Sequence, residues 1–205
     1  MENGGVKGVK LSDDSVINVS AVIAATGPHE VCRLVQGAER MSIGKWKEES
    51  RPLYAACLDV ALKQFPYPER VFALGLDEPL YFSKHSGPVT LSDNGALVLH
   101  AMRYNDNDHL RDASSDEKAL TDLMDLLEPG WEKEVVAMRF SPNVLVGYDS
   151  RTLYHNGAGP APSPVVPEVT GLYVAGDWVG AEGRLADAGM ASAKQAAEEV
   201  LRYTN

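Results

Sequence analysis

The residues best placed for ligand chemistry are Gly176 and Asp177, which follow an apolar stretch at residues 171–175. A glycine lets a ligand approach the backbone closely, and an aspartate can accept hydrogen bonds from sugar hydroxyls. A helical pattern begins near Asp187, where small residues leave the first backbone N–H groups accessible to an electron-rich ligand. A strand, a glycine turn, an acid and a helix start commonly hold a nucleotide. An acidic surface turn with an ordinary helix cap explains the same residues equally well.

Other kinds of site have little support in the sequence. The five histidines show no HxH or HExxH spacing and no cluster with the two cysteines, so we predict no metal site. No serine lies in a GxSxG motif, and the catalytic residues stay unknown. Residues 157–160 start like a dinucleotide fingerprint, but Pro162 replaces the third glycine. Asp106, Asp108 and Asp112 lack the rest of a calcium loop, which favours a solvated loop.

The composition restricts the partners of the chain. The chain has 19 Lys and Arg residues and 29 Asp and Glu residues. Its formal net charge of −10 would repel nucleic acid. Two widely spaced cysteines are typical of reduced thiols in the cytoplasm, which is the location we expect. No apolar run approaches the roughly 20 residues of a transmembrane helix, and no signal-peptide pattern is present. We therefore expect no nucleic-acid partner and no transmembrane segment.

Both ends of the chain carry elements that could position a ligand site. Residues 6–11 and 16–25 form a predicted β-hairpin, and its second strand ends in an apolar run typical of a strand buried on both faces. Pro28 suits the first turn of a short helix that packs through Val31, Leu34 and Val35. At the other end, the alanine-rich helix from Asp187 offers a packing face, made of Ala191, Ala193, Ala196, Ala197, Val200 and Leu201.

The middle of the chain is typical of an antiparallel sheet with one helix. Strand candidates alternate with proline and glycine turns, at residues 53–62, 70–76, 79–83, 95–104, 134–140 and 143–148. Ser114 and Glu117 form a capping-box pattern at the start of an amphipathic helix, which Pro129 ends. Residues 157–167 are rich in proline and favour an extended crossing segment. These patterns predict the α+β class.

Two stretches resemble one family of flavoproteins. The C-terminal stretch GLYVAGDWVGAEGRLADAGMASAKQAAEEVL resembles the C-terminal flavin motif of the FAD-dependent amine oxidase and phytoene desaturase superfamily. The N-terminal stretch GGVKGVKLSDDSVINVSAVIAATGPHEVCRLV is similar to the hairpin and returning strand of that superfamily. Ser192–Ala193 stands where the family often has Ser-Gly, and Phe140-Ser141-Pro142 replaces its usual Trp-Pro. The resemblance therefore implies FAD as cofactor without fixing the substrate.

The resemblance also implies roles for individual residues. Gly176 and Asp177 would lie beside the ribityl and pyrophosphate part of FAD. Helix N–H groups at Ala188, Gly189 and Met190 would lie near the pyrimidine edge of the flavin, where negative charge collects on reduction.

At the other end of the chain, Thr26 and Gly27 would lie near the ADP half of FAD. The set of cofactor-binding residues that the resemblance predicts is Thr26, Gly27, Gly176, Asp177, Trp178, Ala188, Gly189 and Met190.

The resemblance finally implies a division of the chain and a reaction. Residues 1–35 and 157–205 would contribute to an FAD-binding α/β domain, and residues 36–156 would form a substrate domain with a mixed or antiparallel sheet. The reaction would remove a hydride from an apolar or amine substrate. The sequence lacks the GxGxxG fingerprint of the family, so we expect a C-terminal portion that is incomplete and inactive alone.

Two alternatives stay open. The chain could be a non-catalytic binding or regulatory module of the same fold. It could also be a subunit that needs a separate chain with the fingerprint, or that associates with itself.

Overall fold

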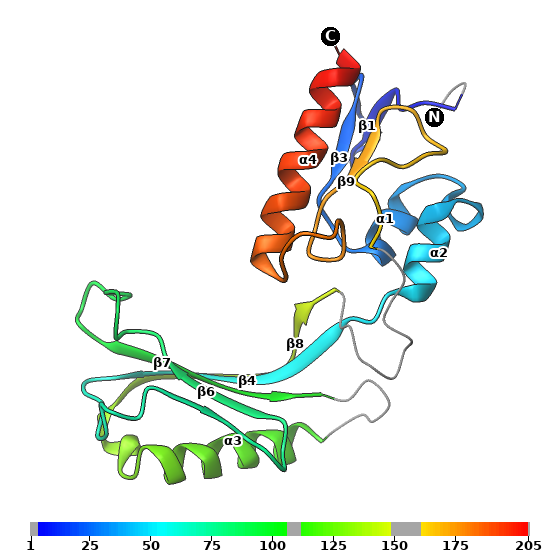
Figure 1. The fold of residues 1–205 in the computed structure, drawn as a ribbon. Helices are drawn as coiled ribbons and strands as arrows, with labels where there is room; N and C mark the ends of the chain where they lie inside the picture. Colours follow the sequence, from blue (N-terminus) through cyan, green and yellow to red (C-terminus); the bar gives the residue numbers. More distant parts are fainter. Residues whose placement is uncertain (1–3, 106–111, 149–160, 205) are drawn as a thin grey trace. The chain divides into compact units, whose positions relative to one another are not determined.

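The computed structural model describes residues 4–105, 112–148 and 161–204 and divides into two compact units (Figure 1). Unit 1 comprises Met1–Pro52 and Gly147–Asn205, and unit 2 comprises Leu53–Val146. The boundaries expected from the sequence lie after residues 35 and 156. Residues 38–49 lie in unit 1 because their two helices pack against the first helix of the chain. Assigning the units to cofactor and substrate remains a prediction.

The described residues of unit 1 form two small sheets in place of one long hairpin. Strands β1 (Gly8–Lys10) and β2 (Val16–Asn18) pair antiparallel, whereas β3 (Val22–Ala24) pairs parallel with β9 (Leu172–Val174). The predicted second strand at residues 16–25 is therefore wrong as a continuous element. The chain changes partner at Ser20, whose carbonyl oxygen would lie 2.6 Å from a Cβ on residue 171, so that position requires glycine.

The two paired strands of the parallel sheet differ in burial. All three residues of β9 are buried, but Ile23 at the centre of β3 is 40% exposed. The expectation that the apolar run containing β3 is buried on both faces is therefore wrong. The reason is that β9 is the only partner of β3 among the described strands.

Helix α4 (Ala186–Thr204) packs on β9 through residues spaced four apart. Ala188, Ser192 and Ala196 are buried along this face, and Ala196 contacts the cluster around Tyr173. The predicted packing face is correct for Ala196. It is wrong for three residues that are exposed, namely Ala193, Ala197 and Leu201.

Three short helices complete the described part of unit 1: α1 (Pro28–Leu34), η1 (Ala38–Arg40) and α2 (Ser42–Glu49). Pro28 opens α1 as predicted, and Val31 is fully buried, but Leu34 is 63% exposed and does not pack as expected. The Glu168 carboxylate accepts hydrogen bonds from the backbone N–H and the hydroxyl of Ser42, at 2.9 and 2.7 Å. This carboxylate therefore caps α2 from a distant segment.

The described residues of unit 2 form a five-stranded sheet in the order β5-β6-β7-β4-β8. Its strands are β4 (Leu53–Leu62), β5 (Phe72–Leu74), β6 (Leu80–Lys84), β7 (Leu97–Tyr104) and β8 (Val135–Gly147). The pairings of β4 with β7, β7 with β6 and β6 with β5 are antiparallel, as predicted.

Strand β8 joins two predicted strands into one that contains Pro142. A proline is tolerated there because β8 lies at the edge of the sheet, where a missing N–H costs no ladder hydrogen bond.

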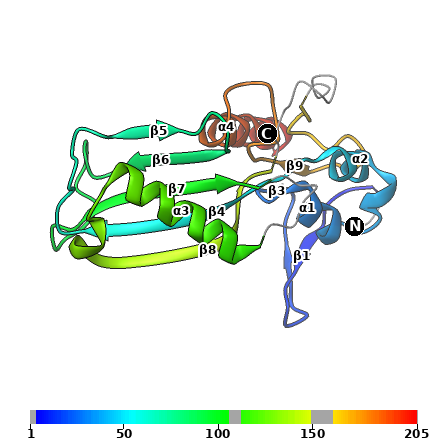
Figure 2. The same ribbon diagram turned by 90° about the horizontal axis from the view of Figure 1, so that it is seen from below.

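Helix α3 (Ala113–Leu127) packs on one face of this sheet, as Figure 2 shows, and the short helix η2 (Trp131–Glu134) follows it. Leu120 and Met124 are buried, and the helix ends before Pro129 as predicted. The predicted capping box does not form because the helix begins before Ser114, and its N-cap is Asp112.

Residues 106–108 and 157–160, interpreted above as loop segments, lie outside the described residues.

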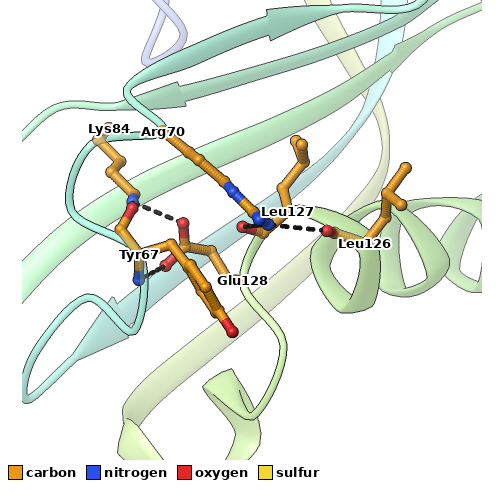
Figure 3. Close-up of polar contacts among 6 residues, drawn as sticks. All are labelled: Tyr67, Arg70, Lys84, Leu126, Leu127 and Glu128. Carbon is orange, nitrogen blue, oxygen red and sulfur yellow. Dashed lines mark hydrogen bonds and ion pairs between the residues drawn. The ribbon is translucent and has the colours of Figure 1, made fainter.

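A buried ion pair joins β6 to the end of α3 (Figure 3). Lys84 Nζ lies 2.5 Å from Glu128 Oε1, and their side chains are only 1% and 0% exposed. The ammonium also donates to the Tyr67 carbonyl oxygen, while Glu128 Oε2 accepts from the Tyr67 N–H at 3.2 Å. The Phe65 ring lies 4.6 Å from Nζ. Both charges are therefore buried and have direct protein partners.

Arg70 extends this network to the end of α3. Its Nη1 donates to the carbonyl oxygens of Leu126 and Leu127 at 3.1 and 2.9 Å, and its guanidinium lies 4.2 Å from the centre of the Tyr67 ring. A cation at these last carbonyl groups stabilises the helix C-terminus.

In the described residues, no helix is both long and apolar enough to cross a bilayer.

Candidate functional site

The turn between β9 and α4 is fixed by Ser192. The Gly176 N–H donates to Ser192 Oγ at 3.0 Å, and the hydroxyl lies 2.9 Å from the Gly176 carbonyl oxygen. A Cβ on residue 176 would lie 2.7 Å from Trp178 Nε1, so only glycine fits this position. Sequence reasoning missed the role of Ser192, which two hydrogen bonds now make clear. The start of α4 and the turn therefore form one rigid element.

Asp177 holds the segment that follows β8. Its Oδ2 accepts a hydrogen bond from the Tyr148 backbone N–H at 2.8 Å. Within residues 4–105, 112–148 and 161–204, Oδ1 has no hydrogen-bond partner. A carboxylate with one oxygen anchored and the other available is oriented to accept from a ligand hydroxyl. Asp177 thus has a structural role that the sequence did not reveal, together with a remaining acceptor.

Trp178 links the ends of the two parallel strands. Its side chain is buried, and Nε1 donates to the Thr26 carbonyl oxygen at 3.0 Å. The ring also packs against Trp46, with centroids 5.9 Å apart. Because β3 and β9 are parallel, their carboxyl ends meet at one edge of the sheet. The structure therefore brings Thr26 and Gly27 close to Gly176 and Trp178.

Buried polar atoms without partners lie beside Gly27. Thr26 Oγ1 and Glu30 Oε2 are inaccessible to water, and neither has a hydrogen-bond partner among the described residues. A Cβ on residue 27 would lie 2.1 Å from Tyr148 Cε1 and 2.8 Å from Glu30 Oε2, so the aromatic ring lies directly against this glycine. Unpaired buried polar atoms are uncommon and mark positions where a polar ligand group would be stabilised. The residues present therefore fit a ligand rich in hydroxyls.

The start of α4 differs from the expectation. The Gly189 N–H donates to the Leu185 carbonyl oxygen at 2.9 Å. The Ala188 N–H donates to the Arg184 carbonyl oxygen at 3.5 Å. These groups were expected to be accessible, but they have partners because the carbonyl groups of Arg184 and Leu185, just before the first helical residue Ala186, accept from them. Met190 is 75% exposed, and nothing lies within 4 Å of a Cβ built on Gly189. Space for a ligand therefore exists beside Gly189, although its N–H group is engaged.

The remaining candidate chemistry is limited in the described part of the chain. No group of three or more His, Cys, Asp or Glu side chains there could hold a metal ion. Cys57 lies buried in β4. Burial, and secondarily the nearby Asp59 carboxylate, raises the pKa of the Cys57 thiol to about 11. A thiol with so high a pKa is a poor nucleophile near neutral pH.

We expect Cys57 to resist alkylation in the folded chain. Below pH 9 its thiolate fraction should be about a hundredfold lower than in the unfolded chain, because the pKa rises from 9.0 to about 11. The measurement is the rate of reaction with iodoacetamide at pH 8, with and without urea, in a Cys32→Ser variant. Equal rates in both solutions would contradict the burial of this thiol.

Comparison with known proteins shows a shared fold. No protein-family model and no curated protein sequence matches the chain. An oxidoreductase from Methanosarcina mazei matches 98% of the chain with a TM-score of 0.65 and 16% sequence identity. A reduced UDP-galactopyranose mutase matches 73% with a TM-score of 0.54 and 13% identity, and a Pyrococcus furiosus protein matches 95% with 0.54 and 16%.

The chain spans only part of these structures, covering 47%, 34% and 44% of their respective lengths. The structure confirms the α+β class, and the chain has a fold that it shares with part of an oxidoreductase.

Proposed function

We propose that this chain is the C-terminal portion of an FAD-dependent oxidoreductase of the amine oxidase and phytoene desaturase superfamily. The observation that carries the proposal is the junction at the carboxyl ends of β3 and β9. Here the turn at Gly176 and Asp177, fixed by Ser192, lies next to Thr26. The fold shared with a Methanosarcina mazei oxidoreductase supports the same conclusion.

Unit 1 would hold the cofactor through three kinds of group. Asp177 Oδ1 and Thr26 Oγ1 would pair with hydroxyl groups of FAD, since both atoms lack partners in the described structure. Gly176 would allow the chain to turn beside the cofactor, and the open space at Gly189 would admit its ring edge. Trp178 would keep the two strand ends together.

The reaction would oxidise an apolar or amine substrate. When bound, FAD would supply a hydride acceptor. Unit 2 would bind the substrate. This binding would orient the carbon that loses the hydride and would exclude water from that carbon.

A second possibility is that a separately encoded chain completes the cofactor site. The two-stranded sheet of β3 and β9 favours it, because Ile23 in β3 is 40% exposed and a further strand could cover it. That chain would carry the GxGxxG turn, whose backbone N–H groups bind the pyrophosphate.

We expect the isolated chain to purify without FAD and to bind it once a fingerprint-bearing segment is supplied. The reason is that the glycine-rich turn and its helix dominate pyrophosphate binding. The measurement is the flavin absorbance of each preparation after gel filtration, with the fingerprint segment fused to the chain or added separately.

The fingerprint segment alone serves as the control for this experiment. Stoichiometric flavin in the isolated chain would show that the chain binds FAD without the fingerprint segment. A completed protein that folds and binds no more flavin than the segment alone would contradict the proposed function.

A further inference from the structure

The face of the unit 2 sheet opposite α3 carries a row of polar side chains. The register places Ser83 in β6 next to His100 in β7, and His100 next to Asp59 in β4. Leu58 and Leu99 are neighbours in sequence of these residues and contribute to the core with α3, so the polar row lies on the other face. Figure 2 shows α3 on the core face of the sheet.

His100 is held in a defined orientation by Asp59. Its Nδ1 lies 2.5 Å from Asp59 Oδ1, and Asp59 Oδ2 lies 3.6 Å from Arg139 Nη2 in β8. When neutral imidazole donates from Nδ1 to the carboxylate, Nε2 carries the lone pair. In the part of the chain that the structure describes, Nε2 has no hydrogen-bond partner. The ring is thus oriented with a free acceptor.

Two aromatic rings lie edge-on to the His100 ring. The centroids of the Tyr81 and His85 rings lie 6.5 and 5.8 Å from that of His100, and Phe72 packs edge-on against Tyr81 at 5.5 Å. The His100 side chain is 21% exposed, so it is reachable but partly shielded from water. An accessible nitrogen base among aromatic rings suits an apolar or aromatic molecule with one O–H or N–H group.

We propose that His100, oriented by Asp59, accepts a proton from the hydroxyl or protonated amine group of a ligand bound on this face. The O–H or N–H bond of the ligand breaks, a bond between hydrogen and Nε2 forms, and the electron pair stays on the ligand heteroatom. The imidazolium that results lies against the Asp59 carboxylate, which balances its charge. Asp59 is a positioning residue because it acts through His100.

The inference deepens the proposed function, because loss of this proton accompanies oxidation of an alcohol or amine carbon. Unit 2 would then contribute a specific base as well as a binding surface. The charged and titratable groups on this face include Asp59 and Cys57 in β4, Tyr81 in β6, His85 after it, Tyr104 in β7 and Arg139 in β8.

A coloured phenol tests the site without flavin. The probe is 4-nitrophenol, whose phenolate absorbs visible light, added at fixed pH to the full chain. Wild type is expected to raise the phenolate fraction to a saturating value, and His100→Gln is expected to abolish that rise. Asp59→Asn should weaken probe binding about tenfold, the loss of one charged hydrogen-bond partner. His29→Gln, which changes an exposed histidine of unit 1, should behave as wild type.

Nitrogen NMR of the imidazole rings gives a second readout that needs no ligand and no His100 variant. In wild type, Nε2 of His100 is expected to be the unprotonated nitrogen of the neutral ring, and Asp59→Asn should shift protonation toward Nε2. An unchanged tautomer in Asp59→Asn, an equal phenolate signal in His100→Gln, or no phenolate signal in wild type would each overturn the proposal. FAD binding by the completed protein is measured separately, so failure here leaves the cofactor site unaffected.

Discussion

Replacing Glu128 by Gln is expected to lower the free energy of unfolding of unit 2 by about 3–5 kcal/mol. The substitution leaves the Lys84 ammonium buried, 1% exposed, without a charged partner. The Tyr67 carbonyl oxygen would still accept from Lys84, but one neutral acceptor does not replace a carboxylate. The measurement is urea unfolding followed by circular dichroism.

Two variants serve as controls for this result. Replacing both partners, Lys84→Met with Glu128→Leu, should cost much less, because no charge remains buried. Asp122→Asn should change stability by less than about 1 kcal/mol, since Asp122 pairs with Lys118 on the surface, where their side chains are 59% and 74% exposed. A loss for Glu128→Gln as small as that for Asp122→Asn would contradict the burial of the pair.

Replacing Trp178 by Ala is expected to destabilise unit 1 by about 3–5 kcal/mol. The substitution leaves a cavity beside Trp46 and removes the hydrogen bond from Nε1 to the Thr26 carbonyl oxygen. Trp178→Phe keeps most of the apolar contact and should cost about 1 kcal/mol for the lost hydrogen bond, plus a smaller packing loss.

Thermal unfolding of the three proteins measures these effects. Leu34→Ala is a control, because Leu34 is 63% exposed and its truncation should change stability by less than about 1 kcal/mol. If Trp178→Ala were as stable as Leu34→Ala, the junction of β3 and β9 would not depend on this ring.

Local sequence patterns predicted the elements whose partners are near in sequence or whose burial follows a simple period. The strand β4 matches its predicted range, residues 53–62, because its nearly continuous apolar run between Pro52 and Pro66 is a local signal. Helix α3 ends where Pro129 requires it. Its start was misplaced, because a capping-box pattern at Ser114 does not by itself fix the first helical residue.

Contacts between distant segments were not predictable in this way. The hydrogen bond from Tyr148 to Asp177 and the ion pair of Lys84 with Glu128 depend on which elements become neighbours. The pairing of His100 with Asp59 depends on strand register, since a slip of one residue would move either side chain to the other face. The apolar run around Ile23 suggested two buried faces, but burial depends on neighbouring strands as well as on composition.

The most direct test of the proposed cofactor site is an FAD titration of the completed protein, comparing wild type with Asp177→Ala. Loss of a charged acceptor for FAD hydroxyls should cost roughly 1.5–3 kcal/mol, which lowers FAD affinity about ten- to a hundredfold. Glu182→Ala, in the same loop and exposed, should leave the affinity unchanged. A thermal melt without FAD measures separately the loss of the hydrogen bond from Tyr148 to Asp177. Equal FAD affinities of wild type and Asp177→Ala would contradict the assignment of Asp177 as a cofactor contact.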